Sequence, residues 1–205
     1  VPVSEGRRAF SSIPLSDYPM EKLDDLALLH IARFLEPKDI VNLGRSCRRL
    51  HSVMPGTTTG EQEWLGDDFH IFGPGGGHWC PEIYFDTPEL RDTVIKMSLT
   101  VTWEDQGFGN RKGELFLKLM RPVPFGEPFE VAEFRRLFGV AEHNQTTRAV
   151  VINNHPVVTK ARVGDFYRFM RNAGGGGGHQ LIVKNFKARA TVVKVLWVTM
   201  ADFSS

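Results

Sequence analysis

Hydrophobic positions change their spacing along the chain, and the change divides it into three zones. In the first zone, apolar residues recur at intervals of three and four, which is the period of an amphipathic helix. These residues are Leu28, Ile31, Leu35, Ile40, Leu43, Cys47 and Leu50. Pro37 ends one helix near Leu35 and is tolerated in the first turn of the next. The pattern therefore predicts short helices between residues 23 and 53.

The second zone, residues 55–81, is rich in Gly, Pro and Thr. This composition predicts a linker without a long regular element. The zone nevertheless carries more large apolar side chains than a freely solvated tether contains. They are Trp64, Leu65, Phe69, Ile71 and Phe72. We therefore expect the linker to pack on a neighbouring domain.

From residue 82 onward the period becomes two. Residues 95–103 alternate apolar and polar side chains without a break, and residues 115–119 repeat the pattern after a segment dense in turn residues. Further strands are expected at residues 148–152, 165–170, 180–183 and 186–198. The segment Phe129–Phe138 departs from this period and predicts a short helix or an irregular insert. Six or more short strands joined by turns indicate an antiparallel β-sandwich over residues 82–205.

The first zone also carries a recognisable motif made of four short runs. They are Leu23-Asp24-Asp25-Leu26, Ile31-Ala32-Arg33-Phe34-Leu35, Pro37-Lys38-Asp39-Ile40 and Ser46-Cys47-Arg48-Arg49-Leu50. In these runs the chain resembles the F-box family. Three positions depart from the family pattern: Asp24 replaces the usual Pro, Leu26 a frequent Glu, and Leu50 a preferred aromatic. The Asp24 departure lies at the family's adaptor-binding edge, so it concerns binding strength more than the fold.

The resemblance implies a Skp-type adaptor of a cullin-RING ubiquitin ligase as the partner. A module of this size cannot bury all its apolar surface alone, so its exposed apolar positions become an interface. The residues that match the family's adaptor-binding positions are Leu23, Leu28, Ile31, Phe34, Leu35, Pro37 and Ile40. The alternative is that these residues only form the core of a helical hairpin.

The third zone resembles the jelly-roll domain associated with the F-box in sugar-recognising proteins. Residues 103–119, 166–169 and 186–191 carry this resemblance. The family binds the glycan through a Tyr-Trp-Lys sequence, whereas the matching positions here are Leu181, Ile182 and Val183. Aliphatic side chains offer neither an aromatic face nor hydrogen-bond donors to a sugar. Glycan binding is therefore disfavoured, and a client protein is the expected ligand.

Loops held by a rigid sheet are the usual place for binding surfaces. We therefore expect the client to contact the loops at residues 104–112 and 172–180. The candidate residues are Asp105, Phe108, Asn110, Arg111, Asn172 and His179.

Charge and composition narrow the possible partners. The formal net charge is +1, so the positive surplus that drives binding to phosphate backbones is missing, and a nucleic-acid partner is not expected. No apolar run approaches the length of a membrane span. The two cysteines, Cys47 and Cys80, fit a reducing compartment. A cytoplasmic or nuclear location is expected, and a processed organellar protein stays open because the sequence does not begin with Met.

No catalytic or metal-binding motif stands out. Ser, His and Asp are scattered without a nucleophile elbow. The candidate soft ligands lack the paired short spacings of a zinc site; they are Cys47, His70, His78 and Cys80. The glycine run 174–178 lacks the following Lys-Ser/Thr of a phosphate-binding loop. We predict no enzymatic activity, no cofactor and no metal, with calcium at Glu104, Asp105 and Asn110 left as an alternative.

These observations predict an α+β chain in four parts: an N-terminal extension (1–18), an F-box-like helical module (19–54), a packed linker (55–81) and an antiparallel jelly-roll sandwich (82–205). The leading hypothesis is a non-catalytic substrate-recognition subunit that binds a Skp-type adaptor and a client protein. The alternative is a structural subunit of a larger assembly, in which the helical module only docks to neighbouring subunits. Asp24 and the apolar linker around Trp64 motivate the alternative.

Overall fold

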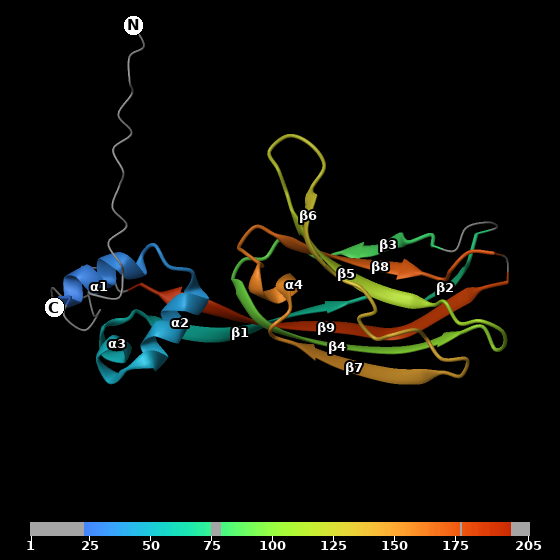
Figure 1. Cartoon of the computed structure of the whole chain (residues 1–205), viewed down its shortest axis with the longest axis horizontal. Coiled ribbons are helices and arrows are strands. Elements are labelled where there is room, and N and C mark those ends of the chain that lie inside the picture. The colour runs from blue at the N-terminus through green and yellow to red at the C-terminus, as the bar shows by residue number, and fades with distance from the viewer. Residues whose placement is uncertain (1–22, 75–78, 177, 198–205) are drawn as a thin grey trace, which may run out of the picture. The chain divides into compact units, whose positions relative to one another are not determined.

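The computed structural model describes residues 23–74, 79–176 and 178–197. It divides the chain into a helical unit within residues 1–55 and a β unit that begins at Gly56, with residues 36–38 grouped with the β unit (Figure 1). The expected N-terminal extension, residues 1–18, lies outside the described residues. The helical unit contains α1 (Asp25–Ala32), α2 (Pro37–Ser46) and α3 (Arg48–Val53).

Side-chain hydrogen bonds set the start of α1 and join it to α3. The Asp24 carboxylate accepts a hydrogen bond from the backbone N–H of Ala27 at 2.7 Å, so Asp24 is the N-cap of α1. Arg49 of α3 donates to the carbonyl of Leu23 and to the carboxylate of Asp25, the latter at 3.1 Å. Asp24 therefore gives this helix a capping side chain where the family usually has Pro.

The β unit is built from two antiparallel sheets. The first sheet contains β1 (Gly56–Leu65), β2 (Phe69–Phe72), β4 (Thr93–Asp105), β7 (Thr146–Ile152) and β9 (Gln180–Leu196). The second sheet contains β3 (Glu82–Asp86), β5 (Glu114–Arg121), β6 (Phe129–Phe134) and β8 (Phe166–Asn172). A short helix, α4 (Pro156–Thr159), follows β7.

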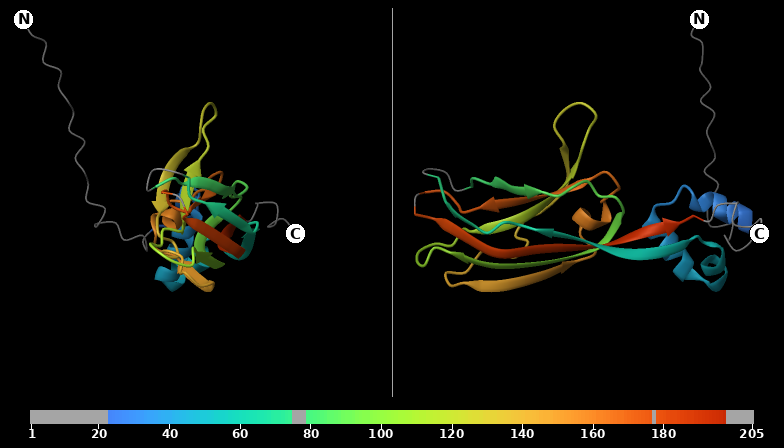
Figure 2. Two further views of the ribbon diagram at one scale, coloured as in Figure 1. Left: turned by 90° about the vertical axis from the view of Figure 1, so that its right-hand side faces the viewer. Right: turned by 180° about the vertical axis from the view of Figure 1, so that it is seen from behind.

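The strand order identifies the sandwich as a jelly roll. The first sheet has the order β1-β9-β4-β7, with β2 also paired to β9, and the second has the order β3-β8-β5-β6. Strands β2 to β9 therefore change sheet at every step except from β5 to β6, which are neighbours in the second sheet, as in the two Greek keys of an eight-stranded jelly roll. The predicted antiparallel jelly-roll fold is confirmed. Figure 2 shows the two layers from the end and from behind.

Aromatic side chains fill the space between the sheets. Trp103, Tyr167, Phe169 and Phe186 are all at most 1% exposed. The Phe169 and Phe186 rings lie edge to face, 5.0 Å apart, the arrangement that aromatic quadrupoles favour. The buried Tyr167 hydroxyl donates to the carbonyl of Val157 in α4, so its polar end is satisfied.

The expected linker at 55–81 instead holds two strands. β1 pairs with β9 over ten residues, from Gly56 opposite Leu196 to Leu65 opposite Lys187. Threonine has a high β propensity, and the continuous β9 strand supplies pairing partners even for the glycines of β1. The predicted packing of this segment holds for Trp64, Phe69 and Ile71, which lie half-buried against the sandwich core. Leu65 and Phe72 are exposed.

The expected helix or irregular insert at 129–138 was wrong for its first half. Residues 129–134 form strand β6, which pairs with β5. A helix there would leave that edge of β5 unpaired, so tertiary context overrides the local pattern. Half-buried Phe134 stacks on half-buried His155, with ring centroids 4.1 Å apart.

Candidate functional site

An exposed apolar stripe runs along α1. Leu26 is 71% exposed, and Phe34, just beyond the helix, is 79% exposed. His30 lies four residues from each and meets the Phe34 ring edge-on at 5.3 Å. Side chains four residues apart share one face of a helix, so Leu26 and His30 form one surface that Phe34 continues.

This stripe overlaps only in part with the predicted adaptor-binding residues. Of these, Phe34 is the most exposed, and Leu23, Ile31, Leu35 and Pro37 are half-buried. Leu28 and Ile40 are 0% and 1% exposed, so in the free protein they lie inside the helical unit and offer no surface to an adaptor. Both side chains belong to the small apolar core of the helical unit. The sequence pattern did not indicate Leu26 as a surface residue, because this position only departs from the family's frequent Glu.

At one end of the sandwich, hydrogen bonds join three loops, which we call the loop end. Its described residues are 106–113, 139–145, 173–176, 178 and 179. Asp105, at the close of β4, anchors the first loop. Its carboxylate accepts hydrogen bonds from the backbone N–H groups of Gln106, Lys112 and Gly113, each at 2.7 Å. The residue is 2% exposed, so its prediction as a client contact was wrong. Its carboxylate oxygens bind backbone N–H groups of the loop itself and do not face outward to a client.

Gln106 links the three loops through hydrogen bonds. Its side-chain oxygen accepts from Nδ1 of His179 at 3.1 Å and from the backbone N–H of Gln180 at 3.3 Å. Its side-chain nitrogen donates to the Asn110 carbonyl, and its own carbonyl is bonded by Nδ1 of His143. Gln106 is 5% exposed, which makes these bonds internal to the protein. The loops therefore form one preorganised surface.

Asn172 also belongs to the interior of the loop end. Its side-chain oxygen accepts from the backbone N–H of Cys80 at 3.1 Å, and its nitrogen donates to the Lys112 carbonyl at 3.4 Å. It is 2% exposed, so its prediction as a client contact was wrong. The physical reason is the same as for Asp105, since a buried polar side chain satisfies the backbone groups of neighbouring loops.

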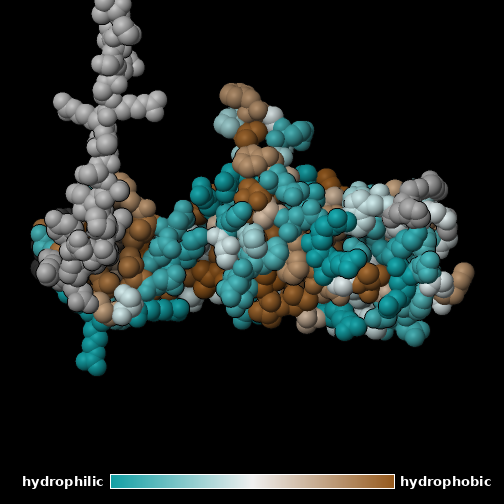
Figure 3. All heavy atoms as spheres, viewed as in Figure 1, coloured by the Kyte–Doolittle hydropathy of each residue, from teal (hydrophilic) through white to brown (hydrophobic). Residues whose placement is uncertain are grey.

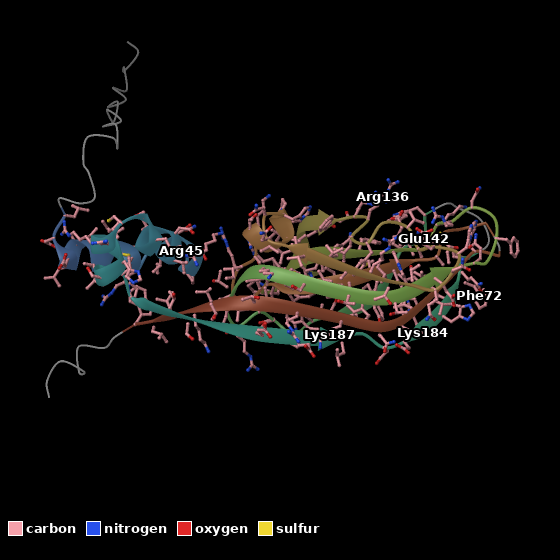
Figure 4. All side chains as sticks on the ribbon, turned by 90° about the horizontal axis from the view of Figure 1, so that it is seen from below. Arg45, Phe72, Arg136, Glu142, Lys184 and Lys187 are labelled. Carbon is pink, nitrogen blue, oxygen red and sulfur yellow. The ribbon has the colours of Figure 1, made fainter. Side chains whose placement is uncertain are left out.

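Aromatic and polar side chains cover the outside of the loop end. Phe108 is 80% exposed, Asn110 and Arg111 are exposed beside it, and His179 is half-buried. Arg111 is held by an ion pair with Glu142. Phe72, at the end of β2, adds a second exposed ring, 67% exposed, which the prediction of a linker missed (Figure 4). Half-buried and exposed side chains alternate over residues 69–72, as expected of a strand, and this pattern could have indicated that Phe72 is exposed.

A second exposed apolar feature is the connection between β5 and β6. Phe125 is 97% exposed and Val123 is 36% exposed, and Figure 3 shows hydrophobic residues gathered at this tip. Three prolines, at positions 122, 124 and 128, restrict the backbone of the connection. The sequence pattern did not single out this loop as a surface.

The described residues contain no group of three or more His, Cys, Asp or Glu that could hold a metal ion. Cys47, His70 and Cys80 lie among these residues, and His78 lies outside them. At the positions of the family's glycan-binding sequence, Leu181 and Val183 are fully buried and Ile182 is half-buried. Nor does any described helix have the length and apolar character needed to cross a membrane.

The family profile of the F-box domain matches residues 20–54. This segment is an F-box domain. The exposed stripe of Leu26, His30 and Phe34 therefore lies within the F-box domain, and so do the buried Leu28 and Ile40.

Solved structures similar to the chain include two from infectious bursal disease virus. The structure of the Gx strain matches at 8% identity and a TM-score of 0.46, and the VP2 subviral particle at 9% and 0.42. The matches cover 66% and 65% of this chain but only 32% and 33% of those chains, so this chain spans about one third of their length. A likeness at these scores is too weak to assign a function. A search of curated proteins found no match.

Proposed function

We propose that this chain is the substrate-recognition subunit of a Skp/cullin-type ubiquitin ligase. The observation that supports the proposal is an F-box domain with exposed Leu26 and Phe34, joined to a jelly roll whose loop end is preorganised. F-box domains bind Skp-type adaptors, and F-box proteins are typically non-catalytic adaptors. Transfer of ubiquitin would therefore be the work of partner subunits, in the cytoplasm or nucleus, where F-box proteins usually act.

The adaptor would bind the exposed stripe of the F-box domain. Burying two large apolar side chains, together with their half-buried neighbours, removes apolar surface that the free domain leaves in water. Phe34 would be the main anchor, because aromatic side chains are enriched in protein interfaces. The client would bind the loop end, where Phe72 and Phe108 provide aromatic area and Asn110 offers hydrogen bonds.

Co-expression with a Skp-type adaptor and size exclusion tests the first half of the proposal. The wild-type chain is expected to elute with the adaptor as a one-to-one complex. The double variant Leu26→Asp, Phe34→Asp is expected to lose it, because both changes put charge on the exposed stripe. Phe125→Asp makes the same kind of change at an exposed site on the sandwich and serves as the control that keeps binding. Substitutions at Leu28 or Ile40 are unsuitable because they would unfold the domain.

The absence of a complex with wild-type chain would contradict the proposal and favour the structural-subunit alternative. If the complex forms, the client half is tested with Phe72→Ala, Phe108→Ala in the adaptor-bound protein. Proteins retained by the wild-type complex should be lost from this variant while the adaptor stays bound. Retention of the same proteins by the variant would place client binding elsewhere on the chain.

A further inference from the structure

The two sheets of the jelly roll expose four edges, and three of them carry features that discourage further strand pairing. β3 has only five residues, with a register shift between Ile83 and Phe85. β6 has a register shift opposite Leu119 and Met120, and Pro128 precedes it. The edge formed by β1 and β2 is weakened by two glycines in β1 and has only four residues in β2. Bulges, charges, proline and short length are the usual protection of an edge strand.

The fourth edge, β7, lacks this protection. It pairs with β4 over seven consecutive residues without a register shift. Its sequence, TTRAVVI, contains no Pro, Gly, Lys or acidic residue. The single charge, on Arg148, is paired with Glu142 of the same chain at 3.4 Å. A long, regular strand of β-branched residues at an open edge is a template for pairing with another strand.

Nothing in the described part of the β unit covers this edge. The recorded backbone pairing of β7 is with β4 alone. Figures 1 and 2 show β7 at the margin of its sheet, beside β4. Val151 is 62% exposed, and Thr147, Arg148 and Ala149 are exposed as well.

We propose that β7 pairs antiparallel with β7 of a second copy of this chain, about a twofold axis at Ala149. The two first sheets would then join into one continuous sheet, with five strands from each copy. This contact is isologous, since the same surface of each copy faces the other. The proposal does not depend on the ubiquitin-ligase function and is tested separately.

The sequence of β7 is complementary to itself in this register. Centring on Ala149 pairs all seven residues and puts Thr147 opposite Val151 and Arg148 opposite Val150. Cross-strand pairs of β-branched residues are favourable, and like charges directly opposite are not. A register centred on Arg148 would set two arginines opposite each other. Ala149 faces its own copy in this register.

The side chains beside β7 are also compatible with a second sheet. Thr147, Ala149 and Val151 lie on the outer face of the sheet with their β4 partners Thr102, Thr100 and Ser98. All six side chains are small or medium-sized and uncharged. The shared outer face would therefore bring no new charge repulsion at the junction.

Sedimentation equilibrium of the full chain over a range of concentrations tests this proposal. The wild-type chain is expected to dimerise. Ala149→Lys and Ala149→Glu each put like charges opposite each other and should weaken dimerisation roughly fivefold or more. Ala149→Thr is the matched control, which keeps an uncharged residue of high β propensity and should dimerise as the wild type does.

An equimolar mixture of the Lys and Glu variants gives the sharpest result. Because position 149 faces itself only in this register, the mixture should re-form a one-to-one dimer that neither variant forms well alone. Equal melting temperatures of the variants and wild type would show that the fold is intact, as expected for an exposed edge residue. A wild-type chain that stays monomeric, an unchanged dimer in the Lys variant, or a mixture that fails to dimerise would each overturn the proposal.

Discussion

The F-box domain and the jelly roll differ in how completely they bury their apolar residues. In the described helical unit, the buried apolar residues are Leu28, Ala32, Ile40, Leu50 and Met54. The sandwich encloses an aromatic core between two sheets and leaves its large exposed side chains on loops and at edges. The helical unit instead exposes Leu26 and Phe34 beside its small core. We therefore expect the sandwich to be stable by itself and the F-box domain to gain stability from a partner.

The largest expected effect is a loss of stability when an aromatic ring in the core of the sandwich is removed. Phe186→Ala removes a ring that packs on Phe85, Phe138 and Phe169. Truncation of a buried Phe typically lowers the free energy of unfolding by about 3–5 kcal/mol. Denaturant unfolding followed by tryptophan fluorescence measures it. Phe125→Ala, at a fully exposed ring, is the control and should change stability by less than about 0.5 kcal/mol. Equal losses in the two variants would contradict this view of the core.

A smaller effect is expected at the loop end. Asp105→Asn keeps the shape of the side chain but replaces a carboxylate that accepts three backbone hydrogen bonds. Hydrogen bonds to charged groups contribute about 1.5–3 kcal/mol, so we expect a loss of about 2 kcal/mol. Hydrogen exchange at Lys112 and Gly113 should become faster. Unchanged exchange at these two amides would show that Asp105 does not hold the loop.

The corresponding test in the F-box domain concerns the cap of α1. Asp24→Ala removes the acceptor for the Ala27 N–H and should cost the helical unit about 1 kcal/mol. Asp24→Asn keeps a good N-cap residue and should retain most of that stability. Helical circular dichroism during thermal unfolding measures the difference. If the Ala and Asn variants melt alike, the cap contributes nothing to this domain.

The smallest expected effect is a pH dependence of the unfolding free energy that arises from half-buried His155. Burial lowers the pKa of His155 below its ordinary 6.5, so the folded protein binds this proton less readily than the unfolded chain. The contribution to stability is therefore present above pH 6.5 and is lost as the pH falls toward the folded-state pKa. His155→Asn removes the titration and keeps an N-cap for α4. Its unfolding free energy should fall less between pH 7 and pH 5; an identical pH slope would exclude His155 as the cause.

Sequence periodicity predicted the elements whose burial follows a simple repeat. The alternation of residues 95–103 gave β4, and the three-and-four spacing gave the helices. It failed for β1, where Thr and Gly pair with a long strand more than 120 residues away, a contact that local composition does not encode. Among the candidate client-binding residues, some are exposed and others are buried. Phe108 is exposed as expected, but Asp105 is buried because its carboxylate binds backbone groups that fold back onto it.

Hydrogen exchange of the full chain, alone and with a Skp-type adaptor, measures whether the F-box domain gains stability from a partner. In the free chain, amides of α1 to α3 should exchange much faster than those of β4 and β9, because the helical unit has the smaller core. Adding the adaptor should slow exchange in the helices and leave both strands unchanged. Helices that are already as well protected as the strands in the free chain, and that the adaptor does not affect, would show that the F-box domain gains no stability from this partner.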